Sequence, residues 1–139
     1  MTDSDELEAI REAKKQALLS QASEDAVDAA RPGSTPDEPI HVESVEQFEA
    51  ALDEYEVVLV DFYADWCGPC QALGQYIGEV AAESTAAVLK VDVDVHQGLA
   101  GQYGVQGIPN LLVFRDGETV QRLVGLKQKE ELLAAIEAA

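Results

Sequence analysis

The sequence predicts an α/β domain in which a mixed β-sheet lies between helices on both of its faces. Strand-like apolar runs alternate with helix-like segments over most of the 139 residues, in the order βαβαβαββα. One run, Val57–Val60, is apolar without interruption, as a central strand covered on both faces requires. Near the end of the chain, Asp116-Gly117 separates two further strand-like runs, and this residue pair favours a tight β-hairpin.

The first elements of this domain follow from local signals. Ile40–Val42 predicts a short strand. Ser44–Asp53 predicts a helix that begins at Ser44 or Glu43, because a serine oxygen can accept a hydrogen bond from the first turn. Glu56–Tyr63 predicts the buried central strand. The remaining elements are predicted to be a helix, a buried strand, a short helix, two hairpin strands and a closing helix: about Cys67 to Glu83, Ala87–Asp94, His96–Tyr103, Asn110–Arg115, Glu118–Leu123 and Gln128–Ala138.

Residues 1–40 differ in character from the rest and predict an appendage. Residues 4–30 have a thin apolar stripe with helical spacing, which makes a helix that would be marginal alone. Arg31–Pro39 contains three prolines and a glycine, a composition typical of a linker. We therefore expect an acidic N-terminal helix and linker over 1–40, and the main domain over 41–139.

The chain is strongly acidic. Nine Lys and Arg residues oppose 27 Asp and Glu residues, for a net charge of −18. This charge argues against nucleic acids and anionic membranes as partners, because both are themselves negative. Self-repulsion of this size is tolerated best where salt screens it, which predicts a halophilic archaeon as the source; an ordinary acidic protein is the alternative.

Nothing in the sequence predicts export or membrane insertion. Residues 1–6 are acidic and no apolar signal region follows them. The longest apolar runs, such as Val57–Val60, are too short to cross a bilayer. We therefore expect a cytoplasmic protein, in which a cysteine pair is more often catalytic than structural.

The only two cysteines, Cys67 and Cys70, lie three residues apart between the predicted central strand and the following helix. At the start of a helix, unpaired backbone N–H groups and the helix dipole both favour a thiolate, which is the nucleophile of disulfide exchange. Cys67 is nearer the helix start and is predicted to attack and to be the more exposed sulfur. Cys70, one turn further on, would then attack the mixed disulfide and release the partner.

Two other interpretations of the cysteines stay open at this point: a permanent disulfide and half of a zinc site. Zinc would need two further ligands, and His41 and His96, the only histidines, lack the paired spacing of such a site. We expect no metal.

The segment from about Val42 to Ala139 resembles the thioredoxin family. The resemblance rests on five features in a fixed order: Val60-Asp61-Phe62, Trp66-Cys67-Gly68-Pro69-Cys70, Gly107-Ile108-Pro109, Asp116-Gly117 and Gly125. It implies a thioredoxin-like mixed sheet sandwiched by helices, with an extra N-terminal helical extension. It also implies reduction of disulfides in client proteins by a Cys67/Cys70 cycle, with thioredoxin reductase as the electron source. No cofactor beyond the redox-active disulfide is expected, and the protein would act as a monomer.

The resemblance also assigns roles to a pair of charged residues. It places Asp61 beneath the cysteine loop, where desolvation would raise its pKa and make it a proton shuttle for Cys70. If the strand turned Asp61 to solvent, it would have no such role. Lys90 matches a lysine that approaches this aspartate in the family, and the alternative is a solvated lysine at a strand end. Gly68-Pro69 between the sulfurs implies a reductant rather than an oxidant.

A client-binding surface is implied around Cys67. In the family the bond before Pro109 is cis, and the Ile108 backbone would then pair with an extended client segment. The implied apolar patch comprises Trp66, Tyr63, Gly68, Pro69, Gly107 and Ile108. For Trp66, packing in the core is the alternative.

The chain departs from the family pattern at several places near the motif. Tyr63 stands where tryptophan is common, Gln71 replaces a frequent lysine, and Asn110 replaces the usual threonine. Gly74-Gln75 occupies a stretch where many members have a kinking proline. Two further functions stay open: an oxidoreductase dedicated to one client, whose selection the N-terminal helix would help, and a binding or assembly module with incidental redox chemistry.

Overall fold

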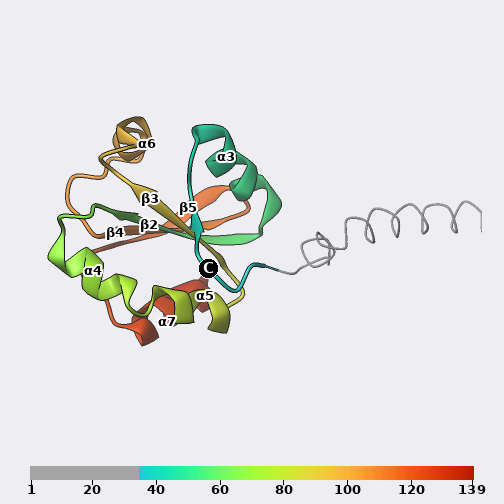
Figure 1. The fold of residues 1–139 in the computed structure, drawn as a ribbon. Helices are drawn as coiled ribbons and strands as arrows, with labels where there is room; N and C mark the ends of the chain where they lie inside the picture. Colours follow the sequence, from blue (N-terminus) through green and yellow to red (C-terminus); the bar gives the residue numbers. More distant parts are fainter. Residues whose placement is uncertain (1–34) are drawn as a thin grey trace, which may run out of the picture. The chain divides into compact units, whose positions relative to one another are not determined.

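The computed structural model describes residues 35–139, and the helix expected over residues 4–30 lies outside them, as do residues 31–34 of the expected linker. A five-stranded sheet has the spatial order β1-β3-β2-β4-β5 (Figure 1). Its strands are β1 (Ile40–His41), β2 (Val57–Tyr63), β3 (Ala87–Asp92), β4 (Asn110–Arg115) and β5 (Glu118–Val124). The first three are parallel to one another, whereas β4 is antiparallel to β2 and β5 is antiparallel to β4. The predicted mixed sheet is confirmed.

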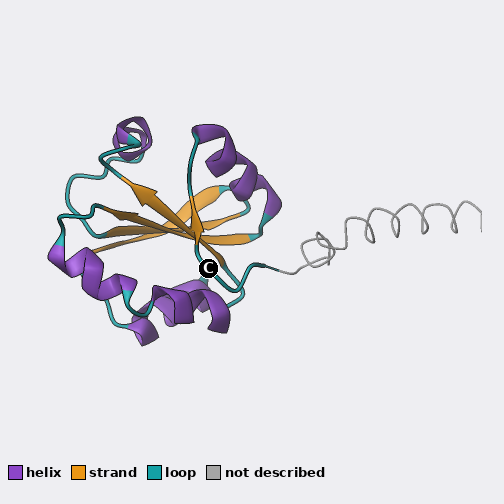
Figure 2. Ribbon diagram, in the orientation of Figure 1, coloured by secondary structure: helices purple, strands orange, loops and turns teal. Residues whose placement is uncertain are grey.

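Helices cover both faces of this sheet, as predicted (Figure 2). Helices α3 (Val45–Glu54) and α6 (Gln97–Gln102) lie on one face. Helices α4 (Gly68–Gly74), α5 (Ile77–Glu83) and α7 (Lys129–Ala138) lie on the other. Only residues 64–67 separate the end of β2 from the start of α4.

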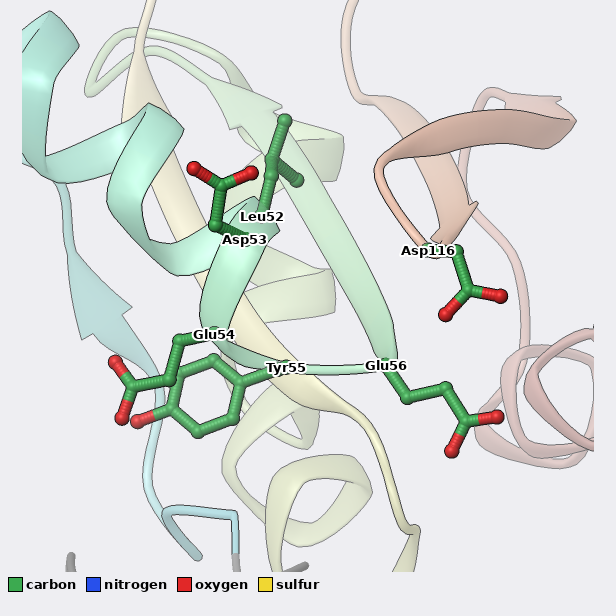
Figure 3. A pocket seen from close by; sticks show the side chains of 6 residues that line it. All are labelled: Leu52, Asp53, Glu54, Tyr55, Glu56 and Asp116. Carbon is green, nitrogen blue, oxygen red and sulfur yellow. The ribbon is translucent and has the colours of Figure 1, made fainter.

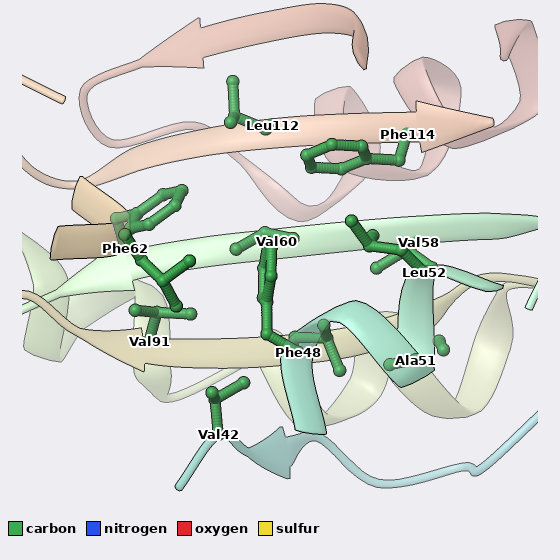
Figure 4. Close-up of a cluster of buried hydrophobic side chains, with 13 residues drawn as sticks. Val42, Phe48, Ala51, Leu52, Val58, Val60, Phe62, Val91, Leu112 and Phe114 are labelled. Carbon is green, nitrogen blue, oxygen red and sulfur yellow. The ribbon is translucent and has the colours of Figure 1, made fainter. Parts of the chain in front are cut away.

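The alternation of side chains along β2 divides the core into two clusters. Val58, Val60 and Phe62 point toward α3 and α6, where they pack with Phe48 and Phe114 (Figure 4). Val57 and Leu59 belong to the other cluster, beneath α4, α5 and α7. Position 61 has the parity of Val57 and Leu59, so this alternation directs its side chain toward the α4 face.

The bounds of most predicted elements shift by no more than two residues, but one predicted helix is divided in two. The single helix expected from Cys67 to Glu83 is two helices, separated at Gln75 and Tyr76. The last turn of α4 closes with short-range bonds from Gln75 N to Ala72 O (3.2 Å) and from Tyr76 N to Leu73 O (3.1 Å). Glycine destabilises a helix interior, and the Tyr76 hydroxyl donates to the Lys127 carbonyl, so Gly74 and this tertiary bond account for the break without a proline.

The helix starts follow the expected capping chemistry. Ser44 Oγ accepts from Gln47 N at 3.0 Å, which makes Ser44 rather than Glu43 the N-cap of α3. Gln128 and Glu131 form a reciprocal capping box at the start of α7. Within residues 35–139, no helix has the length and apolar character needed to span a membrane.

Candidate active site

Cys67 and Cys70 form a disulfide at the start of α4, with their Cα atoms 5.2 Å apart. Cys67 is the N-cap of this helix, and its Sγ accepts a hydrogen bond from Cys70 N at 3.2 Å. Pro69 occupies the first turn, where its missing N–H leaves no bond unmade. Cys67 was expected to be the more exposed of the two cysteines, but the observed difference is small: Cys67 is 5% exposed and Cys70 is 3% exposed.

Gly68 and Pro69, which lie between the two sulfurs, are exposed. The cysteine side chains themselves pack against Ala64, with Tyr63, Val93 and Ile108 around them. The two sulfurs are therefore largely buried among apolar groups, while the residues between them face solvent. Among residues 35–139, no three His, Cys, Asp or Glu side chains gather in a way that could hold a metal ion.

Asp61 is fully buried in β2, so the alternative that turns it to solvent is wrong. Neither carboxylate oxygen has a hydrogen-bond partner within the described part of the chain. Burial without compensating hydrogen bonds disfavours the charged form, and it raises the pKa of Asp61 to about 6, although the positive charge of Lys90 opposes the shift.

Lys90 is the residue of β3 that pairs with Asp61 in the parallel register. Its Nζ lies 3.8 Å from Asp61 Oδ2, too far for a hydrogen bond but close enough for an ion pair. The Lys90 side chain is only 13% exposed, which rules out a solvated lysine at a strand end. Its ammonium also lies 4.4 Å from the centre of the Tyr63 ring, a cation–π contact.

A cavity of about 380 Å³ lies between Lys90 and Cys70. Its lining includes Cys70, Lys90, Tyr63 and Gly74. A Cβ at position 74 would lie 3.9 Å from Lys90 Nζ, so the glycine keeps this side of the cavity open. Tyr63 thus lines the cavity behind Cys70, whereas it was expected on the client-binding patch.

A second cavity, of about 330 Å³, lies on the other side of the cysteines and is more apolar. It is lined by Trp66, Val93, Ala100, Val105, Gln106, Gly107 and Ile108. We propose that clients bind here and call this cavity the client groove. Trp66 is 71% exposed, so core packing of this residue is excluded, and its Nε1 donates to Asp94 Oδ2 at 2.8 Å. The Ile108–Pro109 peptide bond is cis, as the resemblance implied, and Pro109 is buried.

Of the residues expected to form a flat client-binding patch, Trp66, Gly107 and Ile108 line this groove, whereas its other lining residues were not predicted. Val93, Ala100, Val105 and Gln106 carry no motif, and they reach the groove only because α6 and the following loop fold back beside β3. The one available signal was the apolar Val105 shortly before Gly107-Ile108-Pro109. Asp94, which orients Trp66, was also missed.

A third depression lies at the opposite end of β2 (Figure 3). Its lining combines Leu52 and Tyr55 with four acidic side chains: Asp53, Glu54, Glu56 and Asp116. All four acidic residues are exposed, as solvated acidic groups are, and Figure 3 shows the Glu54 carboxylate beside the Tyr55 ring. We interpret this depression as part of the acidic surface of the protein. The candidate active site is therefore the end of the sheet that carries the cysteines.

Comparison with known proteins gives consistent results. The family model described as Thioredoxin matches residues 39–138. Thioredoxin of Chlamydia caviae is 42% identical over 98 residues, covering 70% of this chain and 95% of that protein. Thioredoxin of Bacillus subtilis is 44% identical over 93 residues, which cover 66% of this chain and 89% of that protein. Among solved structures, the N21Q mutant thioredoxin from Halobacterium salinarum NRC-1 superposes with a TM-score of 0.73 at 46% identity, covering 76% of this chain and 93% of that one.

Proposed function

The chain belongs to the thioredoxin family and is a thiol-disulfide oxidoreductase, and we propose that Cys67 is its attacking sulfur, Cys70 its resolving sulfur and Asp61 its proton carrier. The observation that carries these assignments is the Cys67–Cys70 disulfide at the start of α4, on the sheet face toward which Asp61 is buried.

The reduced protein begins the cycle. The Cys67 thiolate attacks one sulfur of a client disulfide, which forms a mixed disulfide and expels the other client sulfur as a thiolate. Cys70 loses its proton to Asp61 and attacks Cys67 Sγ. The Cys67–Cys70 disulfide forms and the second client thiolate leaves, so the client gains two electrons and the protein is oxidised by two. With a pKa of about 6, Asp61 is ionised at neutral pH and is available as the base.

Membership of the family implies disulfide-containing substrates and a reductase partner in general. We propose that thioredoxin reductase is this partner and that the cycle needs no bound cofactor, because both electrons reside on the two sulfurs. A cytoplasmic monomer suits this role, since one chain carries both cysteines.

The activity is tested with insulin as the disulfide substrate and dithiothreitol as the electron source, in buffer with high salt. Wild-type protein is expected to accelerate insulin reduction well above dithiothreitol alone. A wild type without effect, together with capture of one stable partner in a pull-down, would instead support a binding module.

The client groove is tested with Gly107→Arg. A Cβ at Gly107 meets no atom within 4 Å, so the substitution fits the fold while its side chain obstructs the groove. We expect the KM for insulin to rise about tenfold, with little change in kcat. Gly78→Arg is the matched control, since Gly78 also has free space around its Cβ position but lies in α5, away from the groove. Equal KM values for the two variants would show that clients bind elsewhere.

We also propose that the acidic surface is an adaptation to high salt. The net charge of −18 supports this, as does the likeness to a Halobacterium salinarum protein. Raising KCl from 0.1 to 1 M shortens the Debye length from about 10 Å to about 3 Å, so the thermal unfolding midpoint should rise. Replacing the exposed Glu49, Glu118 and Glu137 with glutamine should weaken this salt dependence. A midpoint that is unchanged or lower at 1 M would contradict the proposal.

A further inference from the structure

Arg122, on β5, makes side-chain hydrogen bonds at both ends of the loop that joins α6 to β4. Its Nη1 donates to Asn110 Oδ1 at 3.0 Å, at the first residue of β4. Its Nη2 donates to the carbonyl of Tyr103, the C-cap residue of α6. A guanidinium can do this because its donors point in fixed, divergent directions.

Asn110 extends this contact to the middle of the loop. It is only 3% exposed, and its Nδ2 donates to the Gly107 carbonyl at 3.2 Å. Asn110 pairs with Val124 in the β4–β5 register, two residues from Arg122, so both side chains stand on the same face of the hairpin. Without Arg122, a buried amide oxygen would lose its partner.

The segment held in this way forms one wall of the client groove. Four of the groove residues lie between the two anchor points: Val105, Gln106, Gly107 and Ile108. The wall also contains a turn at Gly104, whose φ of +65° is in the left-handed region. A Cβ at Gly104 would be 4.0 Å from Arg122 Nη2, so the guanidinium lies against this turn.

We propose that Arg122, acting through Asn110, is a positioning residue that holds the client groove in its binding shape. The proposal rests on the assignment of the groove to client binding. The side-chain hydrogen bonds of Arg122 go to Asn110 and Tyr103, and Arg122 does not line the groove itself. It acts by keeping the Tyr103–Asn110 loop ordered before a client arrives, so that binding does not have to order the loop. Its loss should therefore weaken client binding and leave the sulfur chemistry unaffected.

The test compares Arg122→Gln with Arg115→Gln. Both remove one positive charge from neighbouring strands of the same hairpin. Arg115 binds Glu56 (2.6 Å) and the Ala139 carbonyl (3.0 Å), away from the groove. Arg122→Gln is expected to raise the KM for insulin about fivefold with kcat within twofold, whereas Arg115→Gln leaves both unchanged. The rate at which iodoacetamide alkylates the reduced cysteines should be the same in both variants and in wild type.

Arg122→Lys keeps the charge and serves as the second variant if Arg122→Gln fails to fold. One ammonium cannot reproduce the guanidinium fork, so an intermediate KM is expected. An unchanged KM in the Arg122 variants, beside a raised KM in Gly107→Arg, would overturn the role of Arg122 and leave the groove in place. An unchanged KM in Gly107→Arg would overturn both. Equal losses of kcat and alkylation rate would show a general structural role and also overturn the proposal.

Discussion

Replacing Cys67 with serine is expected to abolish insulin reduction, with a fall in initial rate on the order of 1,000-fold or more. A serine hydroxyl is almost entirely protonated at neutral pH and is a far weaker nucleophile toward sulfur than a thiolate. The fold should persist, because the substitution changes one atom at the N-cap of α4 and serine is itself a favourable N-cap residue. The measurement is the initial rate with dithiothreitol, beside a thermal unfolding curve for each protein.

Cys70→Ser is the matched control for this prediction, because it lacks the resolving sulfur and keeps the attacking one. This variant should attack a client once and remain joined to it, which gives a covalent complex on a gel run without reducing agent. The double variant should form none. Complexes with many clients would indicate a general reductase, and a complex with one client a dedicated enzyme. Covalent capture by Cys67→Ser but not by Cys70→Ser would reverse the assigned roles.

The parts of the fold that could be predicted from the sequence are those set by local interactions. Ser44 starts α3 because its side chain reaches a backbone N–H three residues away. Asp116-Gly117 turns the hairpin because both residues adopt positive φ, 53° and 84°. The burial of Val57–Val60 followed from composition alone. In each case, the residues that determine the structure are neighbours in the chain.

The features that could not be predicted from the residue pattern alone depend on contacts between segments that are distant in the chain. The break between α4 and α5 involves a hydrogen bond from Tyr76 to Lys127, 51 residues away. The groove needs Val93 and Val105 to meet Trp66, and periodicity carries no information on that meeting. The link from Arg122 to Asn110 depends on the hairpin register. The cis bond before Pro109 and the place of Asp61 beneath α4 came from the family resemblance.

Replacing Asp61 with asparagine is expected to stabilise the protein at pH 7 by about 2 to 3 kcal/mol while slowing turnover roughly 10- to 100-fold. Asparagine has the shape of a protonated aspartic acid and carries no charge to bury. The wild-type carboxylate, by contrast, has a pKa of about 6 and is therefore mostly ionised at pH 7, although it is fully buried and has no hydrogen-bond partner among residues 35–139. The same substitution removes the base proposed for Cys70, so stability and activity should change in opposite directions.

The pH dependence gives a stricter test of the same residue. In the folded protein Asp61 has a pKa of about 6, above the value of 3.8 for a free side chain, so the folded state binds this proton more tightly. The stabilisation is complete below pH 3.8 and is lost as the pH rises toward 6. Wild type should therefore lose stability relative to Asp61→Asn across this window in urea unfolding. Asp53→Asn, which changes an exposed carboxylate, controls for net charge and should follow wild type. If the wild-type and Asp61→Asn curves run parallel from pH 4 to 6, the carboxylate does not hold a proton in the fold, and its proposed role as the base for Cys70 loses its physical basis.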